Sequence, residues 1–295
     1  MMRVAHLTDI HWQCRPPLSS LWGKRLLGSA NLYLAGRRHH FDEAVQTRLV
    51  EHVVEQDPDL VIITGDLTAQ ALPAEFEKAR DALDPILQRF PTFIIPGNHD
   101  AYTHQAVRER RIWKHFGTWM GPPDAVIPSH GTGDVRVLGL DPNRPTLADA
   151  IGRLPDAQLN ALTQTLDDVP QDVFCILAIH YPLLGPNGEI YRRRDHTMEN
   201  IDQVIEAIQA AQRPPDLILH GHRHHGYHGC LKTPVAEIPV YNPGSSGYAF
   251  LPEKRRAAGM NIYDIECNAL HAVHRFLYDG QAFAPEPGGA YATGR

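Results

Sequence analysis

Phe93-Ile94-Ile95-Pro96-Gly97-Asn98-His99-Asp100 is a short apolar run that ends in a turn and three polar side chains. The apolar residues predict a buried strand, and Pro96-Gly97 predicts its abrupt end. Asn98 offers an amide oxygen, His99 an imidazole and Asp100 a carboxylate. Asn, Asp and Gly are also ordinary turn formers, so residues 97–100 alone are equally typical of a turn that binds nothing.

The same layout, an apolar run followed by Asp, Asn or His, recurs along the chain. Residues 4–8 precede Asp9-Ile10-His11, residues 60–64 precede Gly65-Asp66, residues 173–179 precede His180, and residues 217–219 precede the block from His220 to His224. Open α/β sheets place their sites at the carboxyl ends of strands, and these side chains are ligands of transition metals. The sequence therefore predicts a metal site at the edge of a sheet.

This set of motifs resembles the calcineurin-like metallophosphoesterase superfamily. The blocks are Asp9-x-His11, Gly65-Asp66, Gly97-Asn98-His99-Asp100, His180 and Gly221-His222-x-His224, which follow the family's order and span residues 9–224 of 295. The resemblance implies an α/β fold, a four-layer αββα sandwich in which two mixed β-sheets pack face to face with helices outside. It says less about the substrate, because these blocks bind metals and phosphate, which all members share.

The ligand types restrict the metal before the resemblance refines the assignment. Carboxylates, imidazoles and one amide oxygen, without thiolate, favour Mn, Fe or Zn over a structural zinc site or a calcium site. Seven ligands are too many for one such ion, so we expect two divalent or mixed-valence metal ions. By resemblance, Asp66 bridges the two ions. Asp9, His11 and His224 would complete one ion, and Asn98, His180 and His222 the other.

The resemblance also implies a reaction. It predicts hydrolysis of a phosphodiester or pyrophosphate bond by attack of a metal-bridging hydroxide. His99 would contact the phosphate and assist departure of the leaving oxygen, and Asp100 would orient the His99 ring and hold its charge. A non-enzymatic alternative, a metal-dependent scaffold protein, stays open. The complete ligand set together with His99 favours the enzyme, because a scaffold would not need His99.

An unusual insertion at about 12–41 separates the first predicted strand from the first predicted helix. It holds five basic residues and no acidic one, and its residues Leu18, Leu21, Trp22 and Leu26 have helical spacing. One interpretation is an ordinary surface helix that packs on the core. The other is a cap beside the site, in which Trp22 and Leu26 bind an anionic, partly apolar substrate or the segment makes peripheral contact with a membrane.

Three consecutive arginines, Arg192, Arg193 and Arg194, follow His180 closely. Guanidinium groups match phosphate oxygens, so we predict that they bind substrate, although solvated loop charge explains them equally well. The insertion favours a lipid-linked nucleotide such as UDP-diacylglucosamine as the substrate. The alternative is a cyclic-nucleotide or glycerophosphodiester phosphodiesterase.

Composition limits the class of protein. The chain has 295 residues, of which 43% are hydrophobic, and we expect one domain over 1–280 followed by a disordered tail over 281–295, which is rich in Pro and Gly. A net charge of −6 predicts no stable nucleic acid binding. The partner that the resemblance implies is a small-molecule phosphoester. Four widely spaced cysteines indicate neither a zinc knuckle nor a disulfide framework. Without a signal-like segment or an apolar run of about 18 residues, we expect a cytoplasmic protein.

Overall fold

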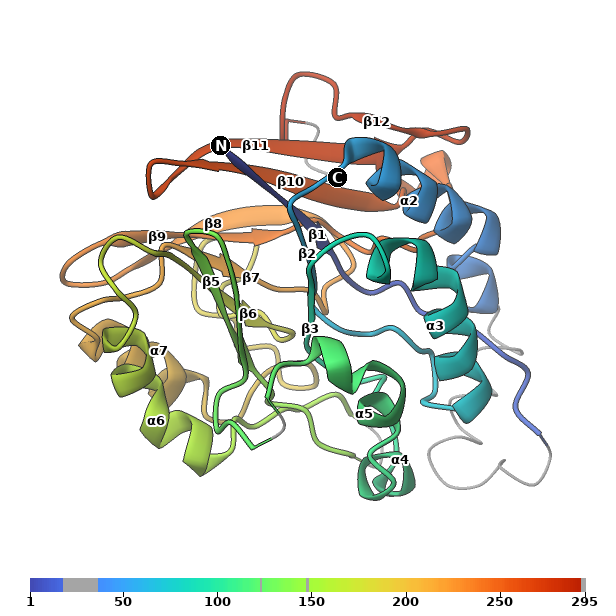
Figure 1. The fold of residues 1–295 in the computed structure, drawn as a ribbon. Coiled ribbons are helices and arrows are strands. Elements are labelled where there is room, and N and C mark those ends of the chain that lie inside the picture. Colours follow the sequence, from blue (N-terminus) through green and yellow to red (C-terminus); the bar gives the residue numbers. More distant parts are fainter. Residues whose placement is uncertain (18–36, 123, 147–148, 293–295) are drawn as a thin grey trace.

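The computed structural model describes residues 1–17, 37–122, 124–146 and 149–292. Within them, two six-stranded sheets form the centre of the protein (Figure 1). The first sheet has the order β12-β11-β10-β1-β2-β3. Its strands are β1 (Met2–Leu7), β2 (Leu60–Ile63), β3 (Thr92–Ile94), β10 (Gly259–Glu266), β11 (Ala269–Tyr278) and β12 (Phe283–Pro285).

The second sheet has the order β4-β5-β6-β7-β9-β8. Its strands are β4 (Ser129–Thr132), β5 (Val135–Leu140), β6 (Phe174–Ile179), β7 (Leu217–Leu219), β8 (Tyr227–Lys232) and β9 (Glu237–Asn242). Both sheets are mixed, because β1, β2 and β3 run parallel while β1 and β10 are antiparallel, and β5, β6, β7 and β9 run parallel while β8 and β9 are antiparallel.

Helices cover the outer faces of the two sheets. In the part of the chain that the structure describes, the α-helices are α2 (Glu43–Gln56), α3 (Pro73–Leu87), α4 (His104–Arg108), α5 (Arg111–Phe116), α6 (Asp156–Asp167) and α7 (Ile201–Ala210). Along β1 the side chains alternate, so that Ala5 and Leu7 pack with helix residues such as Leu49 and Phe76, whereas Val4 faces the other sheet. The predicted four-layer αββα sandwich is therefore confirmed.

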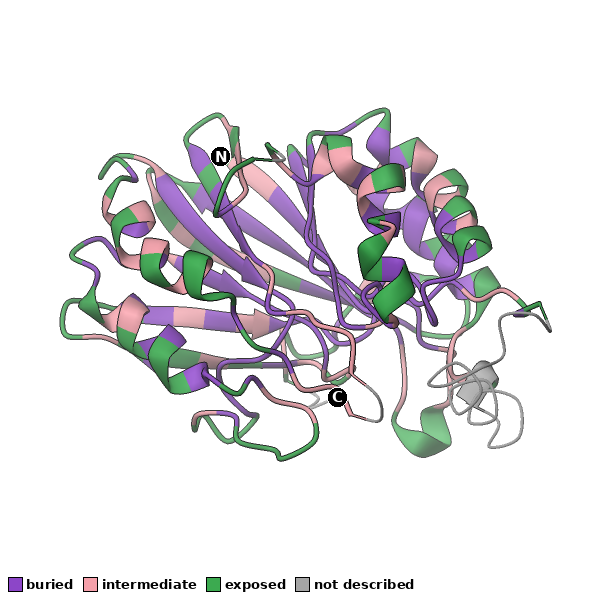
Figure 2. Ribbon diagram, turned by 90° about the horizontal axis from the view of Figure 1, so that it is seen from below, coloured by how far each residue is buried: buried purple, intermediate pink, exposed green. Residues whose placement is uncertain are grey.

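The core between the sheets explains why the strands read as continuous apolar runs. Val4, Ile62 and Phe93 of the first sheet meet Val137 and Ile176 of the second in one buried cluster. Figure 2 shows the strands of both sheets as mostly buried, with exposed residues on the outward sides of the helices. Since the sheets are covered on both faces, the carboxyl ends of their parallel strands are left to carry polar groups.

The tail predicted to be disordered over 281–295 is ordered through residue 292. Phe283–Pro285 forms β12, which pairs with β11, and Glu286 is only 4% exposed. The prediction was wrong because it relied on the Pro and Gly content of the segment. A buried ion pair, between Glu286 Oε2 and Arg275 Nη1 at 3.0 Å, holds the segment in place, and composition does not reveal it. Residues 293–295 lie outside the described residues.

The insertion is described only at its two ends. Residues 12–17 leave the sheet after β1, and residues 37–41 return to α2, where the Asp42 side chain caps the helix by accepting from the Ala44 amide. Trp22 and Leu26 lie outside the described residues, so their role in substrate or membrane contact stays a prediction. Among the described residues, no helix has the length and apolar character that crossing a membrane requires.

A core substitution tests the packing of the two sheets. Phe93 is fully buried between them, so Phe93→Ala should lower the free energy of unfolding by about 3–5 kcal/mol through lost burial and a cavity. Val235 is 64% exposed, and Val235→Ala should leave stability almost unchanged. Denaturant unfolding measures both. An equally small loss for both variants would contradict the described packing.

Candidate metal centre

All seven side chains predicted to bind metal lie together at the carboxyl ends of parallel strands. Asp9 and His11 follow β1, Asp66 follows β2 and Asn98 follows β3, so the first sheet supplies four of the seven. His180 follows β6, and His222 and His224 follow β7, so the second sheet supplies the rest. The site therefore joins the two sheets at one edge of the sandwich.

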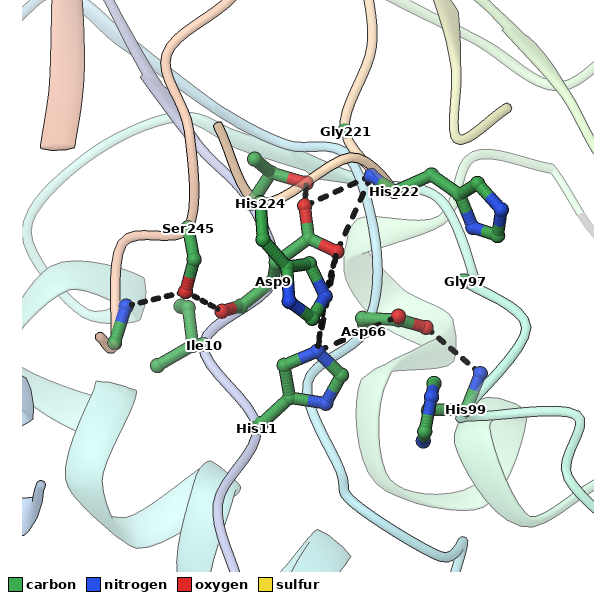
Figure 3. A network of polar contacts seen from close by, with 12 residues as sticks. Asp9, Ile10, His11, Asp66, Gly97, His99, Gly221, His222, His224 and Ser245 are labelled. Atoms are coloured by element: carbon green, nitrogen blue, oxygen red, sulfur yellow. Dashed lines mark hydrogen bonds and ion pairs between the residues drawn. The ribbon is translucent and has the colours of Figure 1, made fainter. Parts of the chain in front are cut away.

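One half of the site consists of Asp9, His11, Asp66 and His224, whose ligand atoms all lie within 4.8 Å of one another (Figure 3). His11 Nε2 is 3.1 Å from His224 Nε2 and 3.5 Å from Asp66 Oδ2. His224 Nε2 is also 3.2 Å from Asp9 Oδ1. Two ring nitrogens and two carboxylates thus converge on one small volume.

The other half contains Asn98, His180 and His222. Asn98 Oδ1 lies 3.1 Å from His180 Nε2 and 2.8 Å from His222 Nδ1. His180 Nε2 is 3.4 Å from Asp66 Oδ2, the same oxygen that approaches His11 on the other side. Asp66 therefore stands between the two sets of ligands, where the resemblance implies a bridging carboxylate.

The chemistry of these donors fits a pair of metal cations. Asp9 is fully buried and Asp66 is 1% exposed, and the groups around them are imidazoles and an amide rather than Lys or Arg. Burial opposes ionisation of Asp66, yet the His180 ring and its neighbours hold the pKa of this carboxyl well below its usual range. Two buried negative charges without a cation would be costly. The residues present thus fit the dinuclear centre that the resemblance implies.

The imidazoles are prepared to act as ligands. His11 Nδ1 donates to the Thr68 carbonyl at 3.2 Å and His180 Nδ1 donates to the Thr64 carbonyl at 2.7 Å. A carbonyl only accepts, so each Nδ1 carries a proton and each Nε2 is directed into the site, where the lone pair of a neutral ring would bind a metal. Burial also lowers the pKa of His11 well below its usual value, which keeps that ring neutral.

The backbone at the site is strained. Five of the seven ligands have a left-handed φ between 51° and 70°: Asp9, His11, Asp66, His222 and His224. Such a conformation costs about 1–3 kcal/mol for a residue other than glycine and persists only where its surroundings impose it. Part of the surroundings is the His222 amide, which donates to Asp9 Oδ2 at 2.9 Å, and another part is Ser245 Oγ, which donates to the Asp9 carbonyl at 2.6 Å (Figure 3).

Asp66 is held by the turn that follows β3. The His99 amide donates to Asp66 Oδ1 at 2.7 Å, which leaves Oδ2 turned toward the imidazoles. A Cβ at Gly97 would lie 2.2 Å from Asp66 Oδ1 and 2.3 Å from the Asp66 amide nitrogen. Only glycine permits this close approach of the two strand ends.

Asp100 does not orient the His99 ring, so that part of the sequence prediction was wrong. His99 Nδ1 instead donates to the Ala69 carbonyl at 2.6 Å. The Asp100 carboxylate is turned away, toward backbone amides of Leu67, Thr68 and Gly97 at 3.0–3.2 Å. Burial, together with Asp66, raises the pKa of Asp100 to about 6. Asp100 is therefore a positioning residue that fixes the loop after β2.

His99 lies beside the ligands as predicted. Its ring stands edge-on to His11, with ring centres 4.7 Å apart, and stacks on Tyr102 at 5.4 Å. The described contacts place it next to the first half of the site without making it one of the seven ligands.

The three arginines are exposed. Arg192 pairs with Asp202 at 2.9 Å, and Arg193 Nε pairs with Asp195 Oδ1 at 3.1 Å. These carboxylates are the partners that the structure gives Arg192 and Arg193, and binding of substrate by Arg192, Arg193 and Arg194 stays a prediction.

Sequence reasoning missed several aromatic neighbours of the ligands. Tyr181 stacks on His222 with ring centres 4.5 Å apart, and Phe41 packs on His11 at 4.4 Å. Tyr181 follows a ligand directly, which is a signal that the sequence offers. Phe41 is thirty residues from His11, and only the return of the insertion brings it there. A cleft of about 340 Å³ opens here, lined by His11, Gln13, Arg15, His39 and Phe41 among others.

Gly97 provides a test of the bridging position. Gly97→Ala should push Asp66 out of place and reduce the bound metal measured by elemental analysis to well under the wild-type content. Gly229→Ala is the matched control, because its added Cβ would meet Leu184 Cδ1 at an ordinary 3.4 Å. Full metal content in Gly97→Ala would show that Asp66 does not bridge in the manner described.

Comparison with known proteins gives the same family as the geometry. The family model of the calcineurin-like phosphoesterases matches residues 2–226. A probable cyclic nucleotide phosphodiesterase of Synechococcus sp. is 28% identical over 177 residues, covering 59% of this chain and 60% of that protein. A probable glycerophosphodiester phosphodiesterase GpdQ of Arcobacter nitrofigilis is 29% identical over 125 residues, covering 42% of each. The chain thus spans 60% and 42% of the lengths of these two relatives.

Solved structures share the fold at low sequence identity. Purple acid phosphatase PPD1 from yellow lupin has a TM-score of 0.56 at 14% identity, covering 96% of this chain and 53% of that one. A dimetal phosphatase from Danio rerio has a TM-score of 0.56 at 11% identity, covering 96% of this chain and 98% of that one. Since the family model extends over most of the chain and its motif residues meet in one site, the chain belongs to the calcineurin-like phosphoesterase family.

Proposed function

We propose that the protein is a two-metal phosphodiesterase. The observation that carries this proposal is the position of Asp66, whose Oδ2 lies 3.5 Å from His11 Nε2 and 3.4 Å from His180 Nε2, between two complete sets of ligands. Two adjacent metal ions, when bound, lower the pKa of water and neutralise charge on a phosphoryl group during displacement. The relatives named above, both described as probable phosphodiesterases, support a diester rather than another phosphoester.

The chain's own residues supply orientation and a contact outside the ligands. The Ala69 carbonyl fixes the His99 ring through Nδ1, so Nε2 is the atom that faces a substrate oxygen. From this position His99 contacts the phosphate and assists departure of the leaving oxygen. Asp100 accepts hydrogen bonds from two amides of the loop that carries Ala69. It therefore acts on the His99 ring indirectly, by holding the Ala69 carbonyl in place. A metal-dependent scaffold protein would not need an oriented His99 ring beside the metal centre.

We place the organic group that is esterified to the substrate's phosphate in the cleft beside His11. Phe41 offers an apolar wall there, and the exposed Arg15 offers a positive charge to the phosphate or to a polar substituent. Cyclic nucleotides and glycerophosphodiesters both have the size and polarity for such a cleft. UDP-diacylglucosamine has no support from the named relatives, and it depended on Trp22 and Leu26, which lie outside the described residues.

The activity is tested with a chromogenic phosphodiester such as bis(p-nitrophenyl) phosphate. We expect hydrolysis with Mn²⁺ that chelation abolishes, and His99→Asn should keep the bound metal while losing about 10²- to 10⁴-fold in turnover. Metal analysis on the same preparations separates lost chemistry from lost binding. Absence of hydrolysis with Mn, Fe and Zn alike, in protein that retains metal, would contradict the enzyme and favour the scaffold.

The cleft is tested by Arg15→Ala. Because a hydrogen bond to a charged group contributes about 1.5 kcal/mol, we expect a rise of about ten-fold in KM for cyclic AMP or glycerophosphocholine, with kcat almost unchanged. Arg48 lies on the exposed side of α2 and pairs with Glu51, so Arg48→Ala is the matched control. Turnover of both substrates and of UDP-diacylglucosamine by the wild type decides the substrate class. An unchanged KM in Arg15→Ala would show that the organic group of the substrate does not bind in this cleft.

A further inference from the structure

The C-terminal segment 286–291, here called the brace, enters the polar interior behind the metal centre. It lies beyond residue 226, where the family match ends. Glu286 is 4% exposed and pairs with Arg275, which is 3% exposed. Glu286 Oε2 also accepts from the Tyr291 amide at 2.6 Å, and the Arg275 guanidinium lies 4.6 Å from the centre of the Tyr291 ring. The Glu286 carboxylate and the Tyr291 ring thus fix the brace to Arg275 of β11, and the hydrogen bond between Tyr291 and Glu286 closes the brace on itself.

Arg275 also contacts the loops that carry the ligands. Its Nε and Nη2 donate to the Pro243 carbonyl at 3.3 and 3.2 Å. A Cβ at Gly226 would lie 2.0 Å from Nη2, so the guanidinium rests directly on the turn that follows His224. The Arg275 guanidinium, which Glu286 holds in place, therefore supports the loop that carries His224.

Tyr291 reaches the same loop through its hydroxyl, which donates to the Asn242 carbonyl at 3.1 Å. Asn242 Nδ2 in turn donates to the carbonyl of Gly221, the residue before the ligand His222. Tyr291 has a left-handed φ of 64°, a strained conformation that these contacts maintain.

The turn that begins at Asn242 and Pro243 continues to Ser245. The Ser245 amide donates to the His224 carbonyl at 3.1 Å, and Ser245 Oγ donates to the Asp9 carbonyl at 2.6 Å. The turn is therefore held between the brace on one side and, on the other, the two segments that carry Asp9 and the pair His222 and His224.

A second branch leads from the brace to the other half of the site. Asn261 Nδ2 donates to the hydroxyls of Tyr291 at 2.6 Å and Tyr263 at 2.8 Å. Tyr263 contacts His6 Nδ1 at 3.3 Å, and His6 Nε2 contacts Thr64 Oγ1 at 2.8 Å. The Thr64 carbonyl is the group that orients His180, as described above. Burial lowers the pKa of His6 to about 3, so this ring is neutral and can accept a hydrogen bond at one nitrogen while it donates at the other.

We propose that Arg275, Glu286 and Tyr291 are positioning residues that set the metal affinity of the centre. Neither branch touches a reacting atom. The first ends on the Gly221 carbonyl, next to His222, and the second ends on the hydroxyl of Thr64, whose carbonyl accepts from His180 Nδ1. Groups of this kind behind the ligands typically change metal affinity by about 10- to 100-fold when altered. The inference concerns the metal centre and does not depend on which phosphodiester is hydrolysed.

The test uses two conservative variants of the full chain. Glu286→Gln keeps the size of the side chain and removes its charge, and Tyr291→Phe keeps the ring and removes the hydroxyl. Asp216→Asn is the control. Asp216 Oδ2 accepts from Arg213 Nη2 and from the Cys175 amide, both at 2.7 Å. These contacts lie at the amino ends of β6 and β7, away from the ligands at the carboxyl ends. The Kd for Mn²⁺ is measured by calorimetry on chelator-stripped protein, and Tm is measured without metal.

We expect Glu286→Gln and Tyr291→Phe to raise the Kd for Mn²⁺ by about ten-fold or more. Asp216→Asn should lower the metal-free Tm and leave the Kd as in the wild type. The proposal is overturned if both brace variants lose Tm but keep the wild-type Kd, or if Asp216→Asn weakens Mn²⁺ binding to the same extent. Tyr291→Phe decides the question if Glu286→Gln does not fold. No substrate is needed, so the result is independent of the proposed phosphodiesterase activity.

Discussion

Two buried carboxylates, Asp9 and Asp66, impose the main constraint on this structure. Each sits at the end of a parallel strand, away from water and surrounded by imidazoles rather than by basic side chains. Neutralisation by metal cations would offset the cost of burying this negative charge, which would couple metal binding to folding. The left-handed backbone at five ligands adds to the same demand, because strain of this kind must be offset by what the residues bind.

The loop after β2 organises three imidazoles at once. Its carbonyls at Thr64, Thr68 and Ala69 accept from Nδ1 of His180, His11 and His99 respectively. The same loop supplies Asp66, and Asp100 fixes it by accepting from its amides. A carboxylate behind the site thus determines the orientation of a ligand ring and of the proposed phosphate-contacting ring, without touching either. This explains why Asp100 belongs to the motif although its direct role differs from the predicted one.

The fold and the convergence of the seven candidate ligands could be predicted from the sequence because their signals are local. A short apolar run followed by Asp, Asn or His marks both a buried strand and a residue at its carboxyl end. The contact of Phe41 with His11 and the acceptors around Asp100 depend on how distant segments return, which no local pattern records. The order of the C-terminal segment was hidden for a similar reason. Its Pro and Gly residues dominate the composition, while one buried pair between Glu286 and Arg275 holds the segment in place.

The chemistry of the site and the accuracy of its geometry come from different parts of the chain. All seven ligands lie within residues 2–226, the part that matches the family, whereas the turn at 242–245 and the brace lie beyond it. A ligand set fixes which metals and reactions are accessible, but affinity depends on how firmly the strained ligand backbone is held. Two proteins that share every ligand can therefore differ in metal affinity through segments that no ligand motif includes. In this chain, one residue, Asn242, links the C-terminal segment to the ligand loop, because its backbone carbonyl accepts from the Tyr291 hydroxyl and its Nδ2 donates to the Gly221 carbonyl next to His222.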